Sequence, residues 1–337
     1  MDGVLLAIDG NSLVHRSYHA QARTGAQTAD GRPTWAVRGL LTQLVAAVER
    51  VRPTAVVVGF DDPDTSLRRD RWPQYKAHRT DKLDTLVEQL DLARGALDDL
   101  GVAVVVPAGL EADDVLASAA EHGRREGGET VIVTSDRDAF ALIDSRTSVL
   151  RIINGGVEAS PLMTTERLVT LCGVRPEQYR DFAALRGDPS DNLPGVRGIG
   201  ARTAAQVLAS FGTAARAFDD LDAVRDRLGP GVAGRLADAT ARPNWELNCQ
   251  VMAMRHDVSI RPGALPLEAG RVTAAFRAHQ LTWTVAEAVR VLAETDLAPP
   301  REPPRWTDAW SDYPTPPRLP KLPPRKPAMA QLTLFDD

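Results

Sequence analysis

The chain has 337 residues, 43% of them hydrophobic, which is enough for one large domain or for two ordinary domains and a tail. Its two cysteines, Cys172 and Cys249, lie far apart and its six histidines form no HExxH motif, which excludes a disulfide framework and argues against zinc. The formal net charge is −5 and no signal peptide or membrane-spanning apolar run occurs, so we expect a cytoplasmic protein with no membrane partner.

The first part of the chain, residues 1–160, alternates between strand-like and helix-like segments. Apolar runs rich in valine and isoleucine predict strands at residues 4–8, 55–60, 102–107 and 130–135, with a further edge strand at 149–153. Helical spacing of apolar residues predicts helices between them, including 35–50 and 83–100. Strands that alternate with helices predict an α/β fold with a central, mostly parallel sheet and helices on both faces.

Acidic residues occur at or just past the C-terminal end of each of these four strand-like runs. They are Asp9, then Asp61 and Asp62, then Glu111, Asp113 and Asp114, and finally Asp136 and Asp138. In an open parallel sheet these ends lie on one edge, where such folds place their sites. Converging carboxylates repel one another unless hard cations neutralise them, and oxygen ligands suit Mg²⁺ or Mn²⁺. For Glu111–Asp114 alone, helix capping is the simpler explanation, but the recurrence favours a metal site.

A basic segment at residues 66–82 interrupts the alternation. It carries six cations against two acids, with Trp72 and Tyr75 between them. One interpretation is a solvated, charged helix face. The functional alternative is a mobile element beside the acidic edge, in which the cations hold phosphate and a base stacks on the aromatic rings.

The chain from residue 162 to 294 is predicted to be almost wholly helical, except for a glycine-rich run at 187–204. This run has Gly195 and Gly200 at P-loop spacing, but Ala201-Arg202 stands where a P-loop requires Lys and Ser or Thr, so nucleotide hydrolysis is excluded. A helix–hairpin–helix that binds phosphate through backbone amides is the better interpretation. A tight interhelical turn is the alternative, with Asp188 and Asp191 either on the surface or at the metal edge.

Residues 297–330 differ in composition from the rest, because eleven of the 24 prolines lie between Pro299 and Pro327. This composition predicts an extended, disordered tail. The tail ends in an apolar peptide, 331–337, that is unusual for a disordered segment. Without further information, an incidental terminus is the simpler explanation for it.

Taken together, these motifs resemble the 5′-nuclease (flap endonuclease) family, and most closely the 5′–3′ exonuclease domain of bacterial DNA polymerase I. The resemblance covers about residues 1–295, and because no polymerase part follows, we expect a stand-alone nuclease. The motifs that carry it are Ile8-Asp9-Gly10-Asn11-Ser12, Phe60-Asp61, Tyr75-Lys76-Ala77-His78-Arg79, Glu111-Ala112-Asp113-Asp114, Ser135-Asp136-Arg137-Asp138 and the 187–204 run.

The resemblance implies a set of site residues. Two Mg²⁺ ions, or Mn²⁺ in their place, would be bound by Asp9, Asp61, Glu111, Asp113, Asp114, Asp136, Asp138, Asp188 and Asp191. The basic segment resembles the helical arch of the family, at about 63–95, with Lys76, Arg79 and Arg68 as its cations and Tyr75 as its stacking aromatic residue. The helix–hairpin–helix at 185–210, within a helical region at 161–296, would grip duplex backbone and often holds K⁺; its contact residues would be Gly195, Val196, Gly198, Ile199, Gly200, Arg202 and Thr203.

Several positions depart from the family pattern. Ser135 stands where glycine is usual, Arg137 and Arg202 stand where lysine is usual, and Arg197 replaces a frequent proline. None of these changes removes a carboxylate, so we expect an active enzyme. Asp62 adds a second acid beside Asp61, which leaves open which of the two binds metal, although Asp61 aligns better.

The implied activity is Mg²⁺-dependent hydrolysis of DNA at 5′ ends, flaps or nicks by a monomer near the nucleoid, in Okazaki-fragment processing and repair. RNA primers annealed to DNA are further expected substrates. One alternative is a PIN-type ribonuclease, which would leave the 187–204 run unexplained. Another is an inactive DNA-binding module, which predicts missing carboxylates.

The terminal peptide has a resemblance of its own, to the bacterial sliding-clamp binding motif. That motif is a glutamine followed by leucine, a small or acidic residue, leucine and phenylalanine. Here the matching residues are Gln331, Leu332, Leu334 and Phe335. The resemblance implies a sliding clamp as partner, with the proline-rich tail as a tether.

Overall fold

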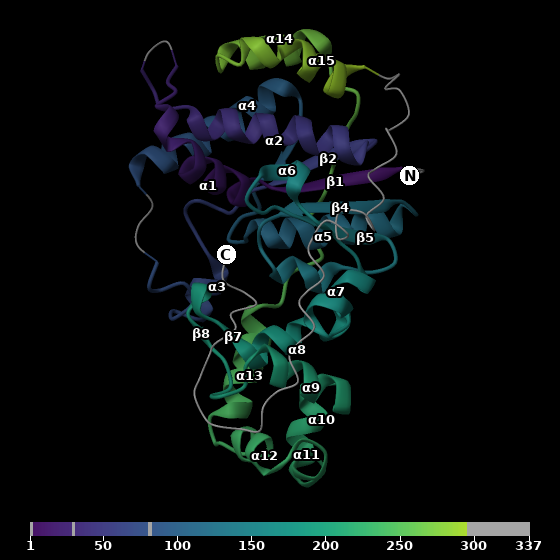
Figure 1. The fold of residues 1–337 in the computed structure, drawn as a ribbon. Helices are drawn as coiled ribbons and strands as arrows, with labels where there is room; N and C mark the ends of the chain where they lie inside the picture. Colours follow the sequence, from purple (N-terminus) through teal and green to yellow (C-terminus); the bar gives the residue numbers. More distant parts are fainter. Residues whose placement is uncertain (1–2, 29–30, 80–82, 295–337) are drawn as a thin grey trace, which may run out of the picture. The chain divides into compact units, whose positions relative to one another are not determined.

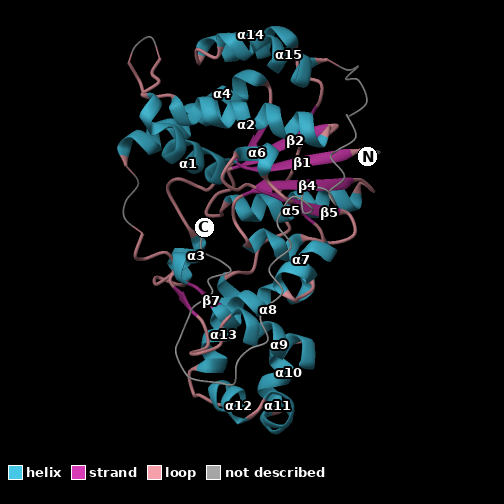
Figure 2. Ribbon diagram, in the orientation of Figure 1, coloured by secondary structure: helices cyan, strands magenta, loops and turns pink. Residues whose placement is uncertain are grey.

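The computed structural model describes residues 3–28, 31–79 and 83–294. The predicted tail and the predicted clamp-binding peptide lie outside these residues. The described chain is built around a seven-stranded sheet in the order β3-β2-β1-β4-β5-β6, with β9 paired to β2 (Figures 1 and 2). Its strands are β1 Val4–Asp9, β2 Ala55–Gly59, β3 Ala103–Val105, β4 Glu129–Thr134, β5 Thr147–Arg151, β6 Leu162–Met163 and β9 Gly263–Ala264.

The sheet is mostly parallel, as predicted. The neighbouring strands β3, β2, β1, β4 and β5 all pair in parallel, whereas β6 and β9 run antiparallel to their partners. In β1, Leu6 and Ile8 face one core cluster while Leu5 and Ala7 face the other. Burial on both faces explains why the strands are continuous apolar runs rather than alternating ones.

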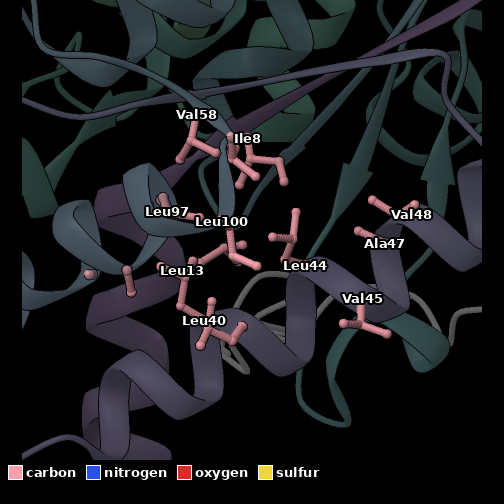
Figure 3. Close-up of a cluster of buried hydrophobic side chains, with 14 of the residues drawn as sticks. Ile8, Leu13, Leu40, Leu44, Val45, Ala47, Val48, Val58, Leu97 and Leu100 are labelled. Carbon is pink, nitrogen blue, oxygen red and sulfur yellow. The ribbon is translucent and has the colours of Figure 1, made fainter. Parts of the chain in front are cut away.

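Helices cover both faces of the sheet. On one face lie α1 Gly10–Gln21, α2 Trp35–Val51 and α4 Asp84–Leu100. Figure 3 shows part of the core that they share with β1 and β2, including Ile8, Leu13, Leu40, Val58 and Leu97. On the other face lie α5 Ala112–Arg125 and the 3₁₀ helix η2 Asp138–Leu142, followed by α7 Thr165–Cys172 and α8 Pro176–Arg186. Short helices also occur at η1 Ala22–Thr24, α3 Leu67–Arg71 and α6 Gly156–Ala159.

The region after α8 is helical, as predicted. It begins with a two-stranded hairpin, β7 Gly187–Asp188 and β8 Leu193–Pro194, which encloses η3 Pro189–Asp191. The helices that follow are α9 Ala201–Phe211, α10 Ala214–Asp219, α11 Leu221–Leu228, α12 Pro230–Leu236 and α13 Ala241–Val251. Because α8 packs against η2, α9 and α13, it joins this region to the sheet.

The last described helices lie within the predicted helical region at 161–296, and they return to the α/β part of the chain. After β9 come α14 Ala269–Ala278, η4 Thr282–Thr284 and α15 Val285–Ala293. Helices α14 and α15 pack against α4 and α2 (Figure 1). The predicted arch is also shorter than 63–95, because Leu86, Leu90 and Ala93 of α4 belong to the core. No helix in the described ranges is both long and apolar enough to cross a membrane.

Candidate active site

The first group of predicted metal-binding acids lies at the carboxyl edge of the sheet. Asp9 is the last residue of β1, Asp61 follows β2 by two residues, and Asp136 follows β4 by two residues. Glu111 caps the N-terminus of α5, the helix that follows β3. Because β2, β1 and β4 pair in parallel, the residues that follow them emerge side by side.

The Asp9 carboxylate is held in place by two hydrogen bonds. It is buried, and it accepts from the Ser12 amide at 2.8 Å and from the Thr134 hydroxyl at 2.7 Å. Burial raises the pKa of Asp9 to about 7, and the nearby carboxylates of Asp61 and Asp136 add to the increase. An ionised carboxylate in this position is therefore unstable without a neutralising cation.

Asp61 and Asp62 have different surroundings. The Asp61 carboxylate accepts hydrogen bonds from the Asn11 amide nitrogen at 2.8 Å and from the Ala112 backbone at 2.9 Å, and it repels Asp9. Asp62 is turned into its own loop, where it accepts from the Gly109 and Asp64 amides and from the Thr65 hydroxyl. These hydrogen bonds lower the pKa of Asp62. Asp61 is the one that faces the acidic edge.

Two of the acids at the start of α5 cap the helix, and the third has a raised pKa. Glu111 and Asp114 form a reciprocal capping box, so the capping interpretation of the sequence holds for both residues. Asp113, between them, is half-buried. The pKa of its carboxyl is raised well above the usual range, chiefly by loss of water and then by repulsion from Asp136 and Asp9.

The second group of acids, Asp138, Asp188 and Asp191, comes from η2, β7 and η3. Burial raises the pKa of Asp138 well above the usual range, and repulsion from Asp136, Asp188 and Asp191 adds to this. The pKa of Asp191 is raised as well, mainly by burial, against the opposing effect of Lys76 and Arg79. Because Asp136 repels members of both groups, the two groups form one continuous acidic surface.

This acidic surface suits hard divalent cations by its chemistry. The donors are carboxylate oxygens. A small recess of about 10 Å³ is lined by Glu111, Asp113, Asp138 and Asp191 together with Arg68, Tyr75, Leu193, Val251, Met252 and Met254. In the part of the chain that the structure describes, no three His, Cys, Asp or Glu side chains are already grouped closely enough to hold an ion. Side-chain adjustment would therefore have to accompany binding.

The basic segment carries its predicted cations to this surface. The Lys76 ammonium lies 3.1 Å from a Glu111 oxygen, and an Arg79 guanidinium nitrogen lies 2.6 Å from an Asp191 oxygen. Both cations line a groove of about 1630 Å³ that also contains Asp9, Asp61 and Asp113. The groove continues to His15, Arg16 and Gln43 on α1 and α2.

Tyr75 differs from its predicted role as a stacking aromatic residue. Its ring is buried against Leu193 and Val251, and its hydroxyl donates to Glu111 at 3.0 Å. The Lys76 ammonium lies 4.6 Å from the centre of the ring. A nucleobase would have to displace these contacts, so the arrangement indicates that Tyr75 positions Lys76 and Glu111.

Arg68, predicted as a further cation of the arch, is turned toward the protein. Its guanidinium donates to Glu111 at 3.0 Å and to both oxygens of Asp114 at 2.7 and 2.9 Å. It also donates to the carbonyls of Val251 and Ala253. All five of its N–H groups are thus engaged. Asp114 in turn accepts from the Arg255 amide, so both charges serve as a clamp between α3, α5 and residues 251–255.

Replacing Arg68 by alanine is expected to lower the free energy of unfolding by about 3–5 kcal/mol, because fully buried Asp114 would lose its partner. Arg69→Ala, at the exposed neighbouring cation, should change it by less than about 0.5 kcal/mol. Urea unfolding of both variants measures the difference. Wild-type stability of Arg68→Ala, together with weaker DNA binding, would favour a role in DNA binding instead.

The residues predicted to contact DNA in the helix–hairpin–helix at 185–210 fall into two sets. Val196 and Ile199 are buried and anchor the loop, which differs from their predicted contact role. Gly195 is also structural, because an added Cβ would lie 2.2 Å from the Arg186 carbonyl oxygen. Gly198 has a positive φ of 78°. In contrast, Gly200, Arg202 and the N-terminus of α9 face outward, and among the residues that the structure describes no side chain caps this helix.

Some residues that organise the site were given no role from the sequence. Asn11 and Thr134 hold Asp61 and Asp9, and the Ser12 and Ser135 hydroxyls are hydrogen-bonded at 2.5 Å. Asn192 donates to the Gln74 carbonyl and so ties the basic segment to η3. Proximity to Asp9 in the sequence could have indicated Asn11 and Ser12. The partners of Thr134 and Asn192 lie 125 and 118 residues away, and no local pattern reveals them.

Comparison with known families accounts for most of the described chain. Residues 4–172 match the family described as 5′–3′ exonuclease, N-terminal resolvase-like domain. Residues 174–272 match the family described as 5′–3′ exonuclease, C-terminal SAM fold.

Curated relatives are similar over the same region. DNA polymerase I of Mycobacterium tuberculosis (strain ATCC 25618 / H37Rv) is 39% identical over 233 residues, which cover 69% of this chain and 26% of that protein. Thermostable DNA polymerase I of Thermus thermophilus is 39% identical over 223 residues, with 66% and 26% covered. The match thus spans about a quarter of the length of these relatives.

Solved structures share the fold. Phage T5 5′-exonuclease with bound zinc is 19% identical, with a TM-score of 0.52 over 74% of this chain and 98% of that one. The catalytic core of Rad2 in complex with DNA substrate is 16% identical, with a TM-score of 0.53 over 86% and 91%.

Proposed function

The chain belongs to the 5′–3′ exonuclease family and is a nuclease of that family, and we propose that it hydrolyses DNA phosphodiesters at 5′ ends and flap junctions with two divalent cations. The observation that carries the proposal is the pair of acid groups joined by Asp136 at the carboxyl edge of the sheet. The solved relatives support it, because the phage T5 exonuclease has bound divalent ions and Rad2 has bound DNA substrate.

In this proposal the acids would hold two Mg²⁺ ions, which Mn²⁺ can replace. Asp9, Asp61, Glu111 and Asp113 would hold one ion, and Asp136, Asp138, Asp188 and Asp191 the other. The ions would supply an activated water and stabilise the leaving 3′ oxygen. Thr134 and Asn11 keep Asp9 and Asp61 oriented toward the groove.

Lys76 and Arg79 would act on the phosphate itself. Both line the groove beside the carboxylates, where their charge can stabilise the scissile group as negative charge develops on it. Arg79 is partly exposed, with 46% of its side chain accessible, and can therefore reorient, whereas Lys76 is held more closely.

The substrate would be recognised by its shape. The described groove and the outward-facing N-terminus of α9 offer backbone-binding groups, and contacts to phosphates position DNA without reading its sequence. We therefore include nicks and RNA primers annealed to DNA among the substrates, and infer a role in Okazaki-fragment processing and repair in the cytoplasm, near the nucleoid. K⁺ would be held at the helix–hairpin–helix.

The rival functions can be separated in one cleavage experiment. A labelled 5′ flap, a nicked duplex and a single-stranded RNA are incubated with the protein, each with and without Mg²⁺. We expect Mg²⁺-dependent cutting of the flap and the nicked duplex. Cutting of the RNA alone would favour a PIN-type ribonuclease. Tight binding of flap DNA with no cutting of any substrate would favour an inactive DNA-binding module.

The DNA-binding role proposed for the helix–hairpin–helix is tested best at Gly200. Its backbone φ of −92° suits any residue, and an added Cβ would meet no atom of the described residues within 4 Å, so Gly200→Val should fold normally. If a phosphate approaches the amides of α9, the new side chain should weaken binding to flap and duplex DNA about tenfold, the scale of one hydrogen bond to a charged group. Fluorescence anisotropy measures this affinity.

Gly195→Ala is the matched control for that variant. Its Cβ would meet the Arg186 carbonyl, so it should lower thermal stability rather than act on the DNA directly. Unchanged DNA affinity of a folded Gly200→Val variant would reduce the loop to a structural turn.

We also propose that residues 331–335 bind the bacterial sliding clamp. The sequence supports this, because Gln331 can hydrogen-bond at a pocket rim while Leu332, Leu334 and Phe335 are compact apolar anchors. A tether raises the effective concentration of the nuclease at flaps and nicks.

A Leu334→Ala/Phe335→Ala double variant should lose clamp binding in calorimetric titration and keep full clamp-free nuclease activity, because the peptide lies outside the catalytic residues. The double variant leaves the prolines of residues 297–330 in place, so the composition of the tail does not change. Equal binding of wild type and double variant, or no binding by the wild type, would rule out this role.

A further inference from the structure

Two cations of the basic segment, Lys76 and Arg79, are each paired with an acid of the acidic surface. Lys76 is paired with an acid of the first group and Arg79 with an acid of the second. Lys76 pairs with Glu111 at 3.1 Å, and Arg79 pairs with Asp191 at 2.6 Å. The accessible fractions of the two carboxylate side chains are only 11% and 13%. The Lys76–Glu111 pair therefore has little screening by water, whereas the Arg79–Asp191 pair is more exposed on its arginine side. Each carboxylate already has a cation beside it.

The backbone reinforces both pairs. The Lys76 amide donates to the Asp191 carbonyl at 3.0 Å, the Arg79 Nε donates to the Ser190 carbonyl, and the Asn192 side chain donates to the Gln74 carbonyl. Lys76 has a φ of 55°, a left-handed conformation that is uncommon for lysine and is maintained here by these contacts. Residues 74–79 are thus docked on η3, with their charges directed at the acids.

We propose that Lys76 and Arg79 compete with divalent cations for Glu111 and Asp191, so that metal binding releases both side chains toward the substrate phosphate. The inference rests on the proposed function, because it assigns the order in which the same site is loaded. A carboxylate oxygen drawn to a metal ion forms a weaker pair with its former partner. By thermodynamic linkage, the factor by which the metal weakens the ion pair equals the factor by which the paired cation weakens metal binding. Removal of that cation must therefore strengthen metal binding by this factor.

Competition gives the site a sequence of events. Before metal binds, the two cations neutralise the acids and are unavailable to DNA. After metal binds, the acids are neutralised by the ions, and the cations are free to bind phosphate. The charged groups needed for chemistry therefore become available together.

The test is Mn²⁺ titration of the full chain without DNA, followed by electron paramagnetic resonance of the free ion. Lys76→Gln and Arg79→Gln should each bind Mn²⁺ about three- to tenfold more tightly than the wild type, the scale expected for loss of one competing charge pair. Arg71→Gln is the matched control, because it removes the same charge from the same segment at a residue that stacks on Trp72. Its Mn²⁺ affinity should stay within about twofold of the wild type.

Several outcomes would overturn the inference. Wild-type Mn²⁺ affinity in both Gln variants would show that the cations and the metal do not compete. An equal increase in Arg71→Gln would show a general charge effect. Because Arg79 is exposed, its variant should fold even if Lys76→Gln does not. If the wild type cleaves DNA with Mg²⁺ while the variants bind Mn²⁺ unchanged, only this inference fails; if no Mn²⁺ binds at all, the proposed function fails with it.

A second measurement reports on the segment directly. Hydrogen exchange of residues 66–79 should become faster when Mg²⁺ is added, because the contacts that dock Lys76 and Arg79 on the acids are weakened. Slower exchange with Mg²⁺ would mean that metal and basic segment bind cooperatively, which contradicts competition.

Discussion

Alanine in place of Asp113 or Asp136 is expected to abolish cleavage and to leave DNA binding detectable. Asp136 repels acids of both groups, and the pKa of Asp113 is raised by burial and then by repulsion from Asp136 and Asp9, so both residues belong to the acidic surface. Loss of the partners that merely orient metal ligands costs 10–100-fold, so loss of a ligand should reduce the turnover rate by more than about 100-fold. Arg202 and the outward-facing N-terminus of α9 remain for binding.

The matched control is Asp64→Ala, which removes an exposed acid that lines the same groove. Its turnover should stay close to that of the wild type, which separates loss of a ligand from a change in net charge. The measurement is the rate of flap cleavage at saturating DNA, with affinity determined separately by anisotropy. Near wild-type turnover by both Asp113→Ala and Asp136→Ala would contradict the assignment of the metal site.

Lys76→Ala is expected to slow the chemical step about 10²–10³-fold, the range found when one oriented charge donor is removed from a transition state. The ammonium lies beside Glu111 and Tyr75 on the wall of the groove, so it is already at the groove when the substrate arrives. Single-turnover kinetics with excess enzyme isolate this step from product release.

Lys76→Arg provides the comparison for that variant. It keeps the charge but changes the geometry of the donor, so it should restore part of the rate if charge is what matters. An effect of Lys76→Ala on DNA affinity alone, with an unchanged single-turnover rate, would make Lys76 an ordinary DNA-binding lysine.

The sheet and its acidic edge were predictable from sequence because both depend on local patterns. Continuous apolar runs such as residues 55–60 specify buried parallel strands, and parallel pairing brings their ends to one edge. The acids at those ends therefore follow from strand positions alone. Asp188 and Asp191 were placed at the same surface by the family resemblance, and the fold brings their charges to Asp138.

The roles of Arg68, Tyr75 and Asp114 could not be predicted in the same way. Their partners include residues 251–255, more than 130 positions along the chain from each of them. Only the folded chain shows that their polar groups are hydrogen-bonded within the protein. A basic segment with aromatic residues has the same composition whether its side chains face DNA or the protein. Gly195 is similar, because its neighbour Gly187 becomes adjacent only through the β7–β8 pairing.

The return of α14 and α15 to the α/β part was missed for a related reason. Helical periodicity predicts a helix but not the surface against which it packs. Here the antiparallel pairing of β9 with β2 directs the chain back to the sheet, and β9 is a strand of only two residues. Such a short strand has no periodicity that a sequence pattern can detect.

The most direct measurement of the central claim is the cleavage of a 5′-labelled flap DNA by the wild-type protein as Mg²⁺ is titrated from zero in the presence of a chelator control. We predict no product without the metal, and with the metal a short labelled product released from the flap junction. We predict that Asp136→Ala produces none under the same conditions. Equal cleavage with the chelator and with Mg²⁺, or no cleavage at any Mg²⁺ concentration, would contradict the account.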